Sequence, residues 1–310
     1  MEILYTPKQI NQPTTISIGT FDGVHRGHRF IIDYANELAK RYQFANMIIT
    51  FDPHPRFVLA KEIQAHFLLT TLEEKLEIMS QMPVDIVYIQ KFTKEFSQLT
   101  PEEFIKILKE NFNMRALVMG YDHSFGVNRS GSYEDIKSLS YKYNFFLYKF
   151  QPFVDDGVFI SSTKIRNLLI KGLVSQANKL LGYNYFIKGK VIEGSKIGRQ
   201  LGFPTANIGE VAEEKIIPGS GVYIIKAFVE DEQYKGIMNI GFRPTFQYSH
   251  NNISLEAHLF DFYRDIYNKP IKIEFLLKIR DEIKFNTIED LIQQIYKDRE
   301  LALRFFYINF

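Results

Sequence analysis

Apolar runs in the first 182 residues alternate with segments that have the hydrophobic spacing of helices. The runs at 47–49, 86–89, 116–119 and 145–148 are short and continuous, as buried strands are. One intervening helix is marked by Thr-Pro-Glu-Glu at 100–103, a capping threonine followed by proline and a capping-box glutamate. Alternation of strands with helices predicts an α/β domain built on a parallel sheet.

The pattern changes after residue 182. Runs rich in β-forming residues, separated by Gly, Pro and Asn, follow at 186–191, 222–229, 236–240, 254–260 and 271–279. Short strands broken by turn residues predict an antiparallel barrel or sandwich. A last helix is predicted from near Thr287, and we expect it to pack across these strands. The pattern therefore predicts two domains, residues 1–182 and 183–310.

Composition narrows the function classes. A chain of 310 residues exceeds the usual size of a single core, which agrees with two domains. Lys and Arg total 38 against 36 Asp and Glu, so the net charge of +2 does not indicate a nucleic-acid partner. The absence of Cys excludes disulfides and thiolate zinc sites and fits a cytoplasmic enzyme. No signal peptide or membrane-spanning run is apparent, so we expect no membrane partner.

The first candidate site is a glycine-rich turn between a predicted strand at 15–18 and a predicted helix at 30–38. Its sequence from Gly19 to His28 places three glycines around two histidines, His25 and His28. A strand, a glycine turn and a helix start allow backbone amides and imidazoles to approach a polyphosphate. Two alternatives stay open: a hydrogen-bonded turn without a ligand, and a metal site. The metal site would use Asp22, His25 and His28, with His54 or His123 as a further ligand.

A second patch lies at the start of another predicted helix, which we expect to run from Ser162 to Lys171 and to end at Gly172. Ser162 and Thr163 supply hydroxyl groups and helix-start amides, and Arg166 supplies a guanidinium fork for a phosphate. Two separate patches of this kind favour a nucleotide-binding site in the first domain.

A third stretch, 194–207, combines glycines, cations, a threonine and an asparagine in the β-rich half. Its candidate phosphate and magnesium ligands are Gly194, Lys196, Gly198, Arg199, Thr205 and Asn207. The stretch lacks the glycine-lysine-serine or threonine ending of a P-loop. A plain hairpin with a proline turn remains the alternative.

A carboxylate in the β-rich half lies on a predicted strand. Alternation along 254–259 places Glu256 and His258 on one face of a strand and Leu255, Ala257 and Leu259 on the other. An exposed glutamate on a strand is more often a solvated surface residue. The strand pattern alone does not assign a function to Glu256.

Motifs in the first half share their order and spacing with a known family. They are GTFDGVHRGH at 19–28, DPHPR at 52–56, GYD at 120–122 and SSTKIR at 161–166. This half resembles the adenylyltransferase half of bacterial bifunctional riboflavin kinase/FAD synthetases, which implies a Rossmann-like nucleotidyltransferase fold. Two positions depart from the family pattern: His123 stands where phenylalanine is common and Thr20 where asparagine is frequent.

The resemblance implies roles for individual residues. His25, His28 and Arg166 would stabilise the reacting phosphates. Further nucleotide ligands would be Gly19, Phe21, Asp22, Gly27, Ser162 and Thr163, and the FMN side would include Arg56, Asp122 and Asn128. The nucleophile would be the terminal phosphate of FMN, whose second pKa of roughly 6 leaves it mostly anionic without a general base.

The β-rich half resembles riboflavin kinases. The motifs are PTAN at 204–207, GVY at 221–223, NIGFRPTF at 239–246 and LEAHL at 255–259. The resemblance implies a barrel of the riboflavin kinase type with Glu256 as catalytic base and with Thr205 and Asn207 holding magnesium and ATP phosphates. Arg280 and Glu282 would shape the flavin end.

The sequence therefore predicts an enzyme that phosphorylates riboflavin to FMN in its C-terminal half and adenylates FMN to FAD in its N-terminal half. ATP, riboflavin and FMN would be its substrates and Mg²⁺ its cofactor. Alternatives are a chain with only one of the two activities, or a flavin-binding carrier or regulator on the same scaffold. A carrier or regulator would bind flavin tightly without turnover of ATP, whereas the enzyme would turn ATP over.

Overall fold

The computed structural model describes residues 1–60, 66–120, 132–150, 154–155, 158–194, 198, 201–230, 232–242 and 253–309. It forms two compact units. The N-terminal unit comprises Met1–Gln64 and Thr70–Ser162, and the C-terminal unit comprises Ala65–Leu69 and Thr163–Phe310. Four predicted site residues, Asp122, Asn128, Lys196 and Arg199, lie outside the described residues, as does His123.

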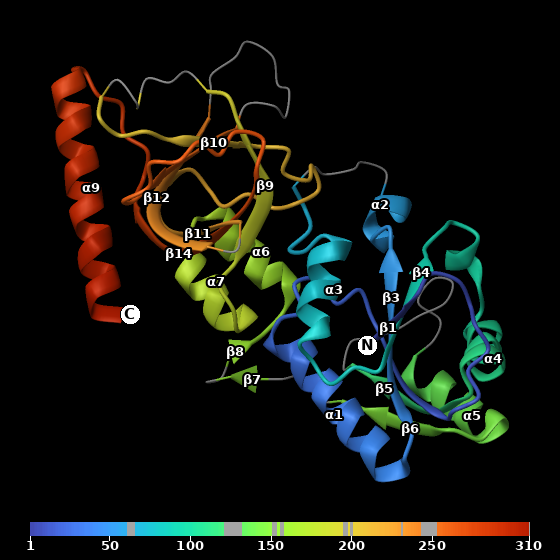
Figure 1. The fold of residues 1–310 in the computed structure, drawn as a ribbon. Coiled ribbons are helices and arrows are strands. Elements are labelled where there is room, and N and C mark those ends of the chain that lie inside the picture. Colours follow the sequence, from blue (N-terminus) through green and yellow to red (C-terminus); the bar gives the residue numbers. More distant parts are fainter. Residues whose placement is uncertain are drawn as a thin grey trace. The chain divides into compact units, whose positions relative to one another are not determined.

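A six-stranded parallel sheet forms the centre of the N-terminal unit (Figure 1). Its strands are β1 (Glu2–Leu4), β2 (Thr14–Ile18), β3 (Ala45–Asp52), β4 (Ile86–Lys91), β5 (Met114–Met119) and β6 (Phe146–Lys149). Its helices are α1 (Arg26–Tyr42), α2 (Pro55–Leu59), α3 (Leu72–Ser80), α4 (Pro101–Phe112) and α5 (Tyr133–Tyr143), with the 3₁₀ turn η1 (Phe96–Gln98). The short strands β7 (Val154–Asp155) and β8 (Val158–Phe159) pair with each other. The predicted parallel α/β domain is confirmed.

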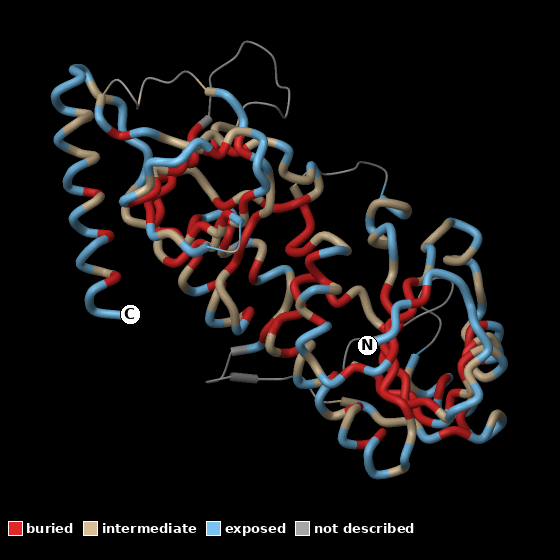
Figure 2. Tube along the Cα trace, in the orientation of Figure 1, coloured by how far each residue is buried: buried red, intermediate tan, exposed pale blue. Residues whose placement is uncertain are grey.

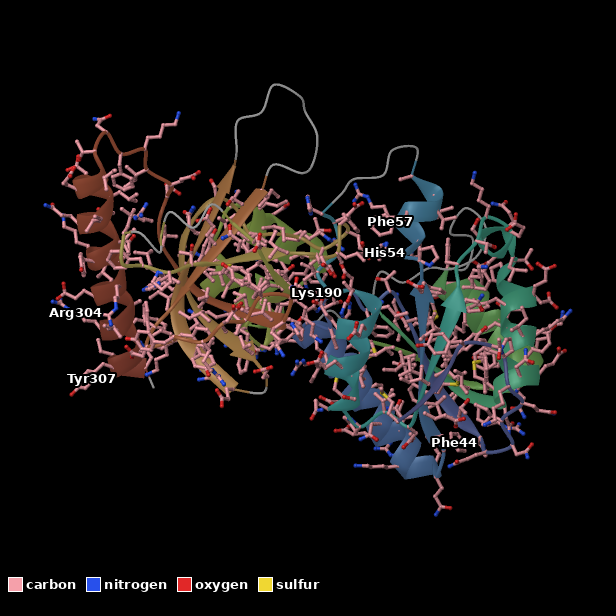
Figure 3. The ribbon with its side chains drawn as sticks, turned by 45° about the horizontal axis from the view of Figure 1, so that its top comes forward. Phe44, His54, Phe57, Lys190, Arg304 and Tyr307 are labelled. Carbon is pink, nitrogen blue, oxygen red and sulfur yellow. The ribbon has the colours of Figure 1, made fainter. Side chains whose placement is uncertain are left out.

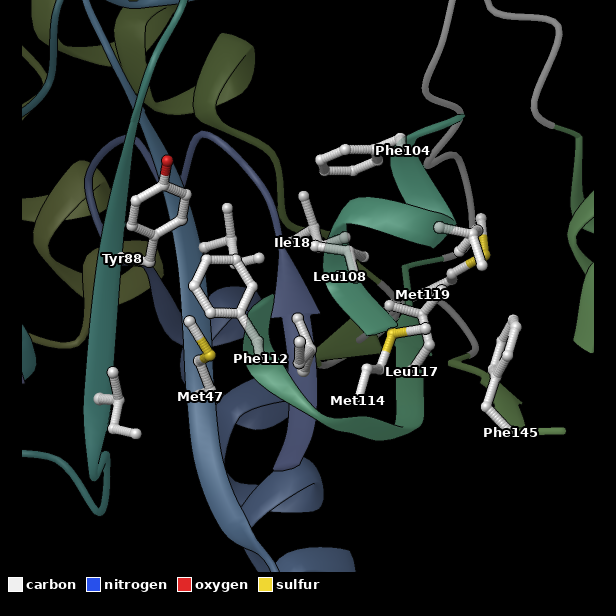
Figure 4. Packing of buried hydrophobic residues seen from close by; sticks show 14 of the residues in the cluster. Ile18, Met47, Tyr88, Phe104, Leu108, Phe112, Met114, Leu117, Met119 and Phe145 are labelled. Atoms are coloured by element: carbon white, nitrogen blue, oxygen red, sulfur yellow. The ribbon is translucent and has the colours of Figure 1, made fainter. Parts of the chain in front are cut away.

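Helices cover both faces of this sheet. On one face, Leu108 and Phe112 of α4 pack against Met47 and other strand residues, and the Phe112 ring lies 4.8 Å from that of Tyr88 (Figure 4). On the other face, α1 and α3 pack against β3, β4 and β5. Burial on both faces explains why these strands read as continuous apolar runs in the sequence. Thr100 closes the predicted capping box at the start of α4.

The strand order β1-β4-β3-β2-β5-β6 indicates the edge of the sheet at which a ligand is expected to bind. The chain proceeds outward from β2 through β3 to β4, then returns to the other side of β2 with β5. In open parallel sheets, ligands bind beyond the carboxyl ends of the strands where the order reverses. The glycine-rich turn directly follows β2. It therefore lies at the edge of the sheet where a ligand is expected to bind.

A closed antiparallel barrel forms the C-terminal unit (Figure 1). Its order is β10-β13-β12-β11-β14-β9, made from β9 (Phe186–Ile192), β10 (Ala206–Gly209), β11 (Gly221–Val229), β12 (Glu232–Phe242), β13 (Ile253–Leu259) and β14 (Pro270–Arg280). α6 (Ser162–Ile170), α7 (Val174–Leu181) and α9 (Ile288–Asn309) complete it. α9 packs Ala302 and Phe306 against the outer face of the barrel. The structure thus decides for a barrel rather than a sandwich and confirms the C-terminal helix.

Buried residues concentrate along the central sheet of the N-terminal unit and along the barrel strands of the C-terminal unit (Figure 2). The burial of β13 alternates, with Leu255, Ala257 and Leu259 buried and the residues between them partly exposed. The alternation predicted for this strand is confirmed. Searched over the described residues, the helices contain no segment that is both long and apolar enough to cross a membrane.

A short segment from the first half of the sequence belongs to the C-terminal unit. Leu68 forms a parallel bridge with Lys215, and its N–H donates to the carbonyl of Glu214 over 2.6 Å. Lys215, fully buried, donates from Nζ to the Leu69 carbonyl over 2.7 Å. We call residues 66–69 the inserted segment. The two compact units divide after Ser162 and again around this segment. The domain boundary at 182/183 therefore stays a prediction.

Candidate functional site

The glycine-rich turn after β2 has an unusual backbone. Phe21, Gly23 and Val24 all adopt positive φ angles, of 47°, 81° and 35°. Left-handed conformations cost non-glycine residues about 1–3 kcal/mol each and persist where surrounding contacts enforce them, often at functional sites. A β-branched valine in this conformation is a marked outlier, which indicates that the turn is shaped for a purpose other than stability.

Side-chain contacts hold the turn in this shape. Asp22, only 1% exposed, accepts a hydrogen bond at Oδ1 from the Thr70 N–H over 3.1 Å. The Gly23 N–H donates to Thr70 Oγ1 over 3.0 Å. Ser162 donates from its hydroxyl to the Asp22 carbonyl oxygen over 3.0 Å. The structure therefore brings the predicted residues Asp22 and Ser162 together and gives the Asp22 carboxylate a role in fixing the turn.

Two stacked imidazoles begin α1. His25 is the N-cap residue, and its Nδ1 accepts from the His28 N–H over 3.3 Å. The two rings lie parallel, with centroids 3.6 Å apart, and Phe21 contacts His28 edge-on. Since Nδ1 of His25 is an acceptor, a neutral ring carries its proton on Nε2. A Cβ on Gly27 would lie 3.3 Å from the His25 ring, so glycine suits this close approach.

The alternative of a metal site gains no support from this geometry. Across the described ranges, no three His, Asp or Glu side chains gather as a metal-binding group. His54 instead caps α2, where its Nδ1 accepts from the Arg56 N–H over 3.2 Å. Figure 3 shows His54 and Phe57 together at this helix. These histidine contacts are those of helix caps.

Arg166 is held within the C-terminal unit. Its Nε donates to the Phe67 carbonyl over 2.8 Å, and its guanidinium lies 3.9 Å from the centroid of the Phe67 ring. Both contacts orient the planar guanidinium. The helix α6 starts at Ser162 as predicted. Nucleotide binding by Thr163 and Arg166 stays a prediction.

The exposed Arg56 lies on α2, which follows β3 at the carboxyl edge of the sheet. Val58 and Leu59 of this helix line a shallow groove of about 350 Å³ together with Lys94, Glu95, Ser97 and Gln98. The rings of Phe51 and Phe96 each contact that of Phe92. The sequence interpretation did not include the groove.

A pocket of about 260 Å³ opens in the barrel. It is lined by Val191, Gly194, Pro204, Thr205, Ala206, Asn207, Ala257, Leu259 and residues 262–267. The structure therefore brings together the predicted residues Gly194, Thr205 and Asn207. A Cβ on Gly194 would lie 2.0 Å from Asn207 Nδ2, so glycine lets the Asn207 side chain keep this position. A Cβ on Gly198 would meet the Phe203 carbonyl oxygen at 2.5 Å. The wall at 262–267 was missed, although its sequence FYRDIY is rich in aromatic and charged residues.

Glu256 lies beside this pocket and does not line it. On β13 it pairs with Asn207 of β10 and with Asn239 of β12, so its side chain neighbours both asparagines. Ser254 donates from its hydroxyl to Glu256 Oε1 over 2.8 Å. Glu282 reaches the same region, because a Cβ on Gly241 would lie 2.6 Å from its Oε1. The two predicted carboxylates thus share one polar face with Asn239 and Ser254, which the sequence interpretation did not single out.

His258, also on this face, fixes the loop before β10. Its Nδ1 lies 2.9 Å from the Pro204 carbonyl oxygen, which can only accept, so Nδ1 carries the proton. Burial lowers the pKa of His258, which favours the neutral ring. This contact explains how the motif residues at 204–207 are held against β13.

Arg280 has a partner within the fold. Its guanidinium forms a bidentate ion pair with Asp298 of α9, with Nη2 2.8 Å from Oδ2. Asp298 is 1% exposed and also accepts from Gln294 over 2.9 Å. The pair joins β14 to α9, and the predicted contact of Arg280 with flavin stays a prediction.

Two family models match the chain in this order: FAD synthetase over residues 7–164 and riboflavin kinase over residues 181–306. The bifunctional riboflavin kinase/FMN adenylyltransferase of Bacillus subtilis (strain 168) is 38% identical, covering 96% of this chain and 94% of the relative. The chain belongs to this bifunctional family. The same-named protein of Escherichia coli (strain K12) is a 34% identical member, covering 94% of this chain and 92% of the relative.

A solved structure agrees over nearly the whole chain. The crystal structure of a macrolide-efflux protein from Streptococcus pneumoniae has a TM-score of 0.86 and 27% identity, covering 97% of this chain and 99% of that chain. Family membership confirms the resemblance stated from the motifs and the prediction of an enzyme with riboflavin kinase and FMN adenylyltransferase domains. ATP and flavins are the substrate classes of the riboflavin kinase/FMN adenylyltransferase family.

Proposed function

We propose that the N-terminal unit transfers the adenylyl group of ATP to FMN, and that the C-terminal unit phosphorylates riboflavin to FMN with a second ATP. The observation that carries the proposal is the pair of stacked imidazoles of His25 and His28 at the start of α1, beyond the central strand β2. Helix-start amides and ring N–H groups at this edge of a parallel sheet are suited to a polyphosphate.

In adenylyl transfer, the FMN phosphate attacks the α-phosphorus of ATP, the bond to the β-phosphate oxygen breaks, and pyrophosphate leaves. In this assignment the Nε2–H of His25, on the far side of the ring from the cap contact at Nδ1, donates to a phosphate oxygen of ATP. His28, stacked on it, supplies the second imidazole. Both donors stabilise charge that grows on the phosphates as the bond breaks. Gly19, Phe21, Asp22 and Gly27 shape the turn, and Ser162, Thr163 and Arg166 are further nucleotide ligands in this assignment.

In the kinase reaction, Glu256 accepts the proton of the riboflavin hydroxyl while the hydroxyl oxygen attacks the γ-phosphorus of ATP. The bond from that phosphorus to the β-phosphate oxygen breaks, and ADP leaves. The hydrogen bond from Ser254 leaves lone pairs on the Glu256 carboxylate for that proton. Thr205 and Asn207 supply hydroxyl and amide oxygens, the ligand type that Mg²⁺ prefers, so the residues present fit that ion. Magnesium would neutralise phosphate charge when bound. Gly194, Lys196, Gly198 and Arg199 are assigned to ATP, and Glu282 and Arg280 to the flavin end.

On the flavin side of the N-terminal unit, the proposal includes Arg56, Asp122 and Asn128. Arg56 lies on α2, the helix whose Val58 and Leu59 line the groove and offer apolar contact for a flat ring system. Asp122 and Asn128 follow β5, the strand on the other side of the switch point from β3. We also propose a cytoplasmic location, where ATP and flavins are available together.

The test is an assay of the purified full chain with magnesium-ATP and either riboflavin or FMN, with flavins separated chromatographically over time. FMN followed by FAD from riboflavin, and FAD from added FMN, would support both activities. Omission of magnesium is expected to stop both reactions. FMN alone would contradict the assignment of the glycine-rich turn, and tight flavin binding without conversion would favour a carrier or regulator.

A further inference from the structure

A buried lysine lies under the glycine-rich turn and has no part in the reactions proposed above. Lys75 of α3 is 5% exposed. Lysine is rarely buried to this degree, because removal of an ammonium from water is costly unless other groups compensate for it. The residue lies outside the motifs, in a helix whose start is fixed by the capping box of Thr71 and Glu74.

The contacts of Lys75 lead directly to the turn. Its Nζ lies 3.1 Å from Oγ1 of Thr50, a fully buried residue of β3. Thr50 in turn donates from Oγ1 to the carbonyl oxygen of Thr20, also over 3.1 Å. An ammonium can only donate, so it occupies an acceptor position of the hydroxyl and directs the single hydroxyl proton to Thr20. The carbonyl of Thr20 belongs to the peptide that precedes Phe21, the first residue with a positive φ angle.

Two carboxylates oppose the effect of burial on Lys75. Burial lowers the pKa of Lys75, and the carboxylates of Asp22 and Asp52 act in the opposite direction and favour its charged form. These carboxylates lie in the turn and at the end of β3, on the edge where a polyphosphate is proposed to bind. A cation that interacts with both carboxylates reduces the repulsion that they exert on phosphate.

We infer that Lys75 is a positioning residue for adenylyl transfer: through Thr50 it fixes the Thr20 peptide and so the turn that carries His25 and His28, while its charge offsets Asp22 and Asp52. The inference rests on the proposed function of the glycine-rich turn. It assigns to Lys75 an effect on the alignment of reacting groups without contact with the substrate.

The test measures kcat and KM for ATP in FAD formation from FMN, using the full chain. We expect Lys75→Met and Thr50→Val each to lower kcat by about 10- to 100-fold with a smaller change in KM, because a misaligned turn affects the transition state more than ground-state binding. Thr50→Ser keeps the hydroxyl and is expected to retain roughly wild-type kcat. Lys75→Met combined with Thr50→Val should lose no more than either alone, since both break one chain of contacts.

Lys109→Met is the matched control. Lys109 is a partly buried lysine of α4 whose Nζ donates to the Asn144 carbonyl, and it has no role in the turn. Its variant should keep wild-type kcat. FMN formation from riboflavin should be unchanged in every variant, because that reaction is assigned to the other unit.

Wild-type kcat in folded Lys75→Met would overturn the inference, as would losses that multiply in the double variant. If Lys75→Met does not fold, the threonine pair decides, and equal kcat values for Thr50→Val and Thr50→Ser would overturn it. A wild-type chain that forms no FAD would overturn the proposed function and this inference together. Wild-type FAD formation with an unaffected Lys75→Met variant overturns the inference alone.

Discussion

His28 combines two kinds of contact at one residue. Its backbone N–H donates to Nδ1 of His25, and its own ring stacks on the same imidazole. Replacement by alanine keeps the first contact and removes the second together with a phosphate donor. We expect His28→Ala to lower the rate of FAD formation by about 10²–10³. Initial rates with FMN and magnesium-ATP measure this loss.

The reciprocal variant is Glu256→Gln. It keeps the shape of the side chain and the hydrogen bond from Ser254 but removes the proton acceptor. We expect phosphorylation of riboflavin to fall by about 10²–10⁴ while FAD formation from supplied FMN continues. Loss of both activities in either variant, with the chain still folded, would contradict the assignment of separate sites.

Among the elements, α9 is joined to β14 by a buried ion pair in addition to its apolar contacts. If Asp298 lost its charge, the Arg280 guanidinium would lose its charged partner. We expect Asp298→Asn to lower the free energy of unfolding by about 3–5 kcal/mol, the usual cost of breaking a buried pair. Urea unfolding followed by circular dichroism measures the change.

The matched control lies on the same helix. Glu300 pairs with Arg304 four residues later, and both side chains are largely exposed; Figure 3 shows Arg304 and Tyr307 pointing outward from α9. Exposed pairs of this kind contribute little, so Glu300→Gln should change the free energy of unfolding by less than about 0.5 kcal/mol. Equal effects of the two substitutions would show that α9 is not held by the Asp298 pair.

Regular elements are where the sequence was most informative. Apolar runs and caps are local signals, which is why β3, β4, β5 and the start of α4 could be predicted from them. The pairing of His25 with His28 followed from their spacing, and the grouping of Gly194 with Asn207 followed from their place in one glycine-rich stretch. Lys75 and Thr50 could not be found this way, because a buried lysine in an amphipathic helix reads as a solvated residue until its neighbours in space are known.

At the scale of the whole molecule, α7 is the element that tests where the kinase half begins. Asn178 of α7 donates to the Phe275 carbonyl over 2.8 Å and accepts from the Tyr185 N–H, and Val174, Ala177 and Leu181 are fully buried. A fragment 183–310 lacks these contacts, whereas 163–310 keeps them. The loss of this burial amounts to about 4 kcal/mol, so the shorter fragment should melt roughly 15 °C lower.

Differential scanning fluorimetry of the two fragments under identical conditions measures this difference. Equal melting temperatures would mean that α7 adds nothing to the barrel and would favour the boundary at 182/183. A lower melting temperature for 183–310 would place the functional start of the kinase half before α6 or α7.

The inserted segment has a consequence for how such a chain can be rearranged. Residues 66–69 supply the carbonyl that receives Lys215 and the ring that orients Arg166, although they are encoded between α2 and α3. The next residue, Thr70, fixes Asp22 and Gly23. No single cut in the gene therefore separates two complete halves. A chimera in which the C-terminal half came from a distant relative would also need residues 66–69 from that relative.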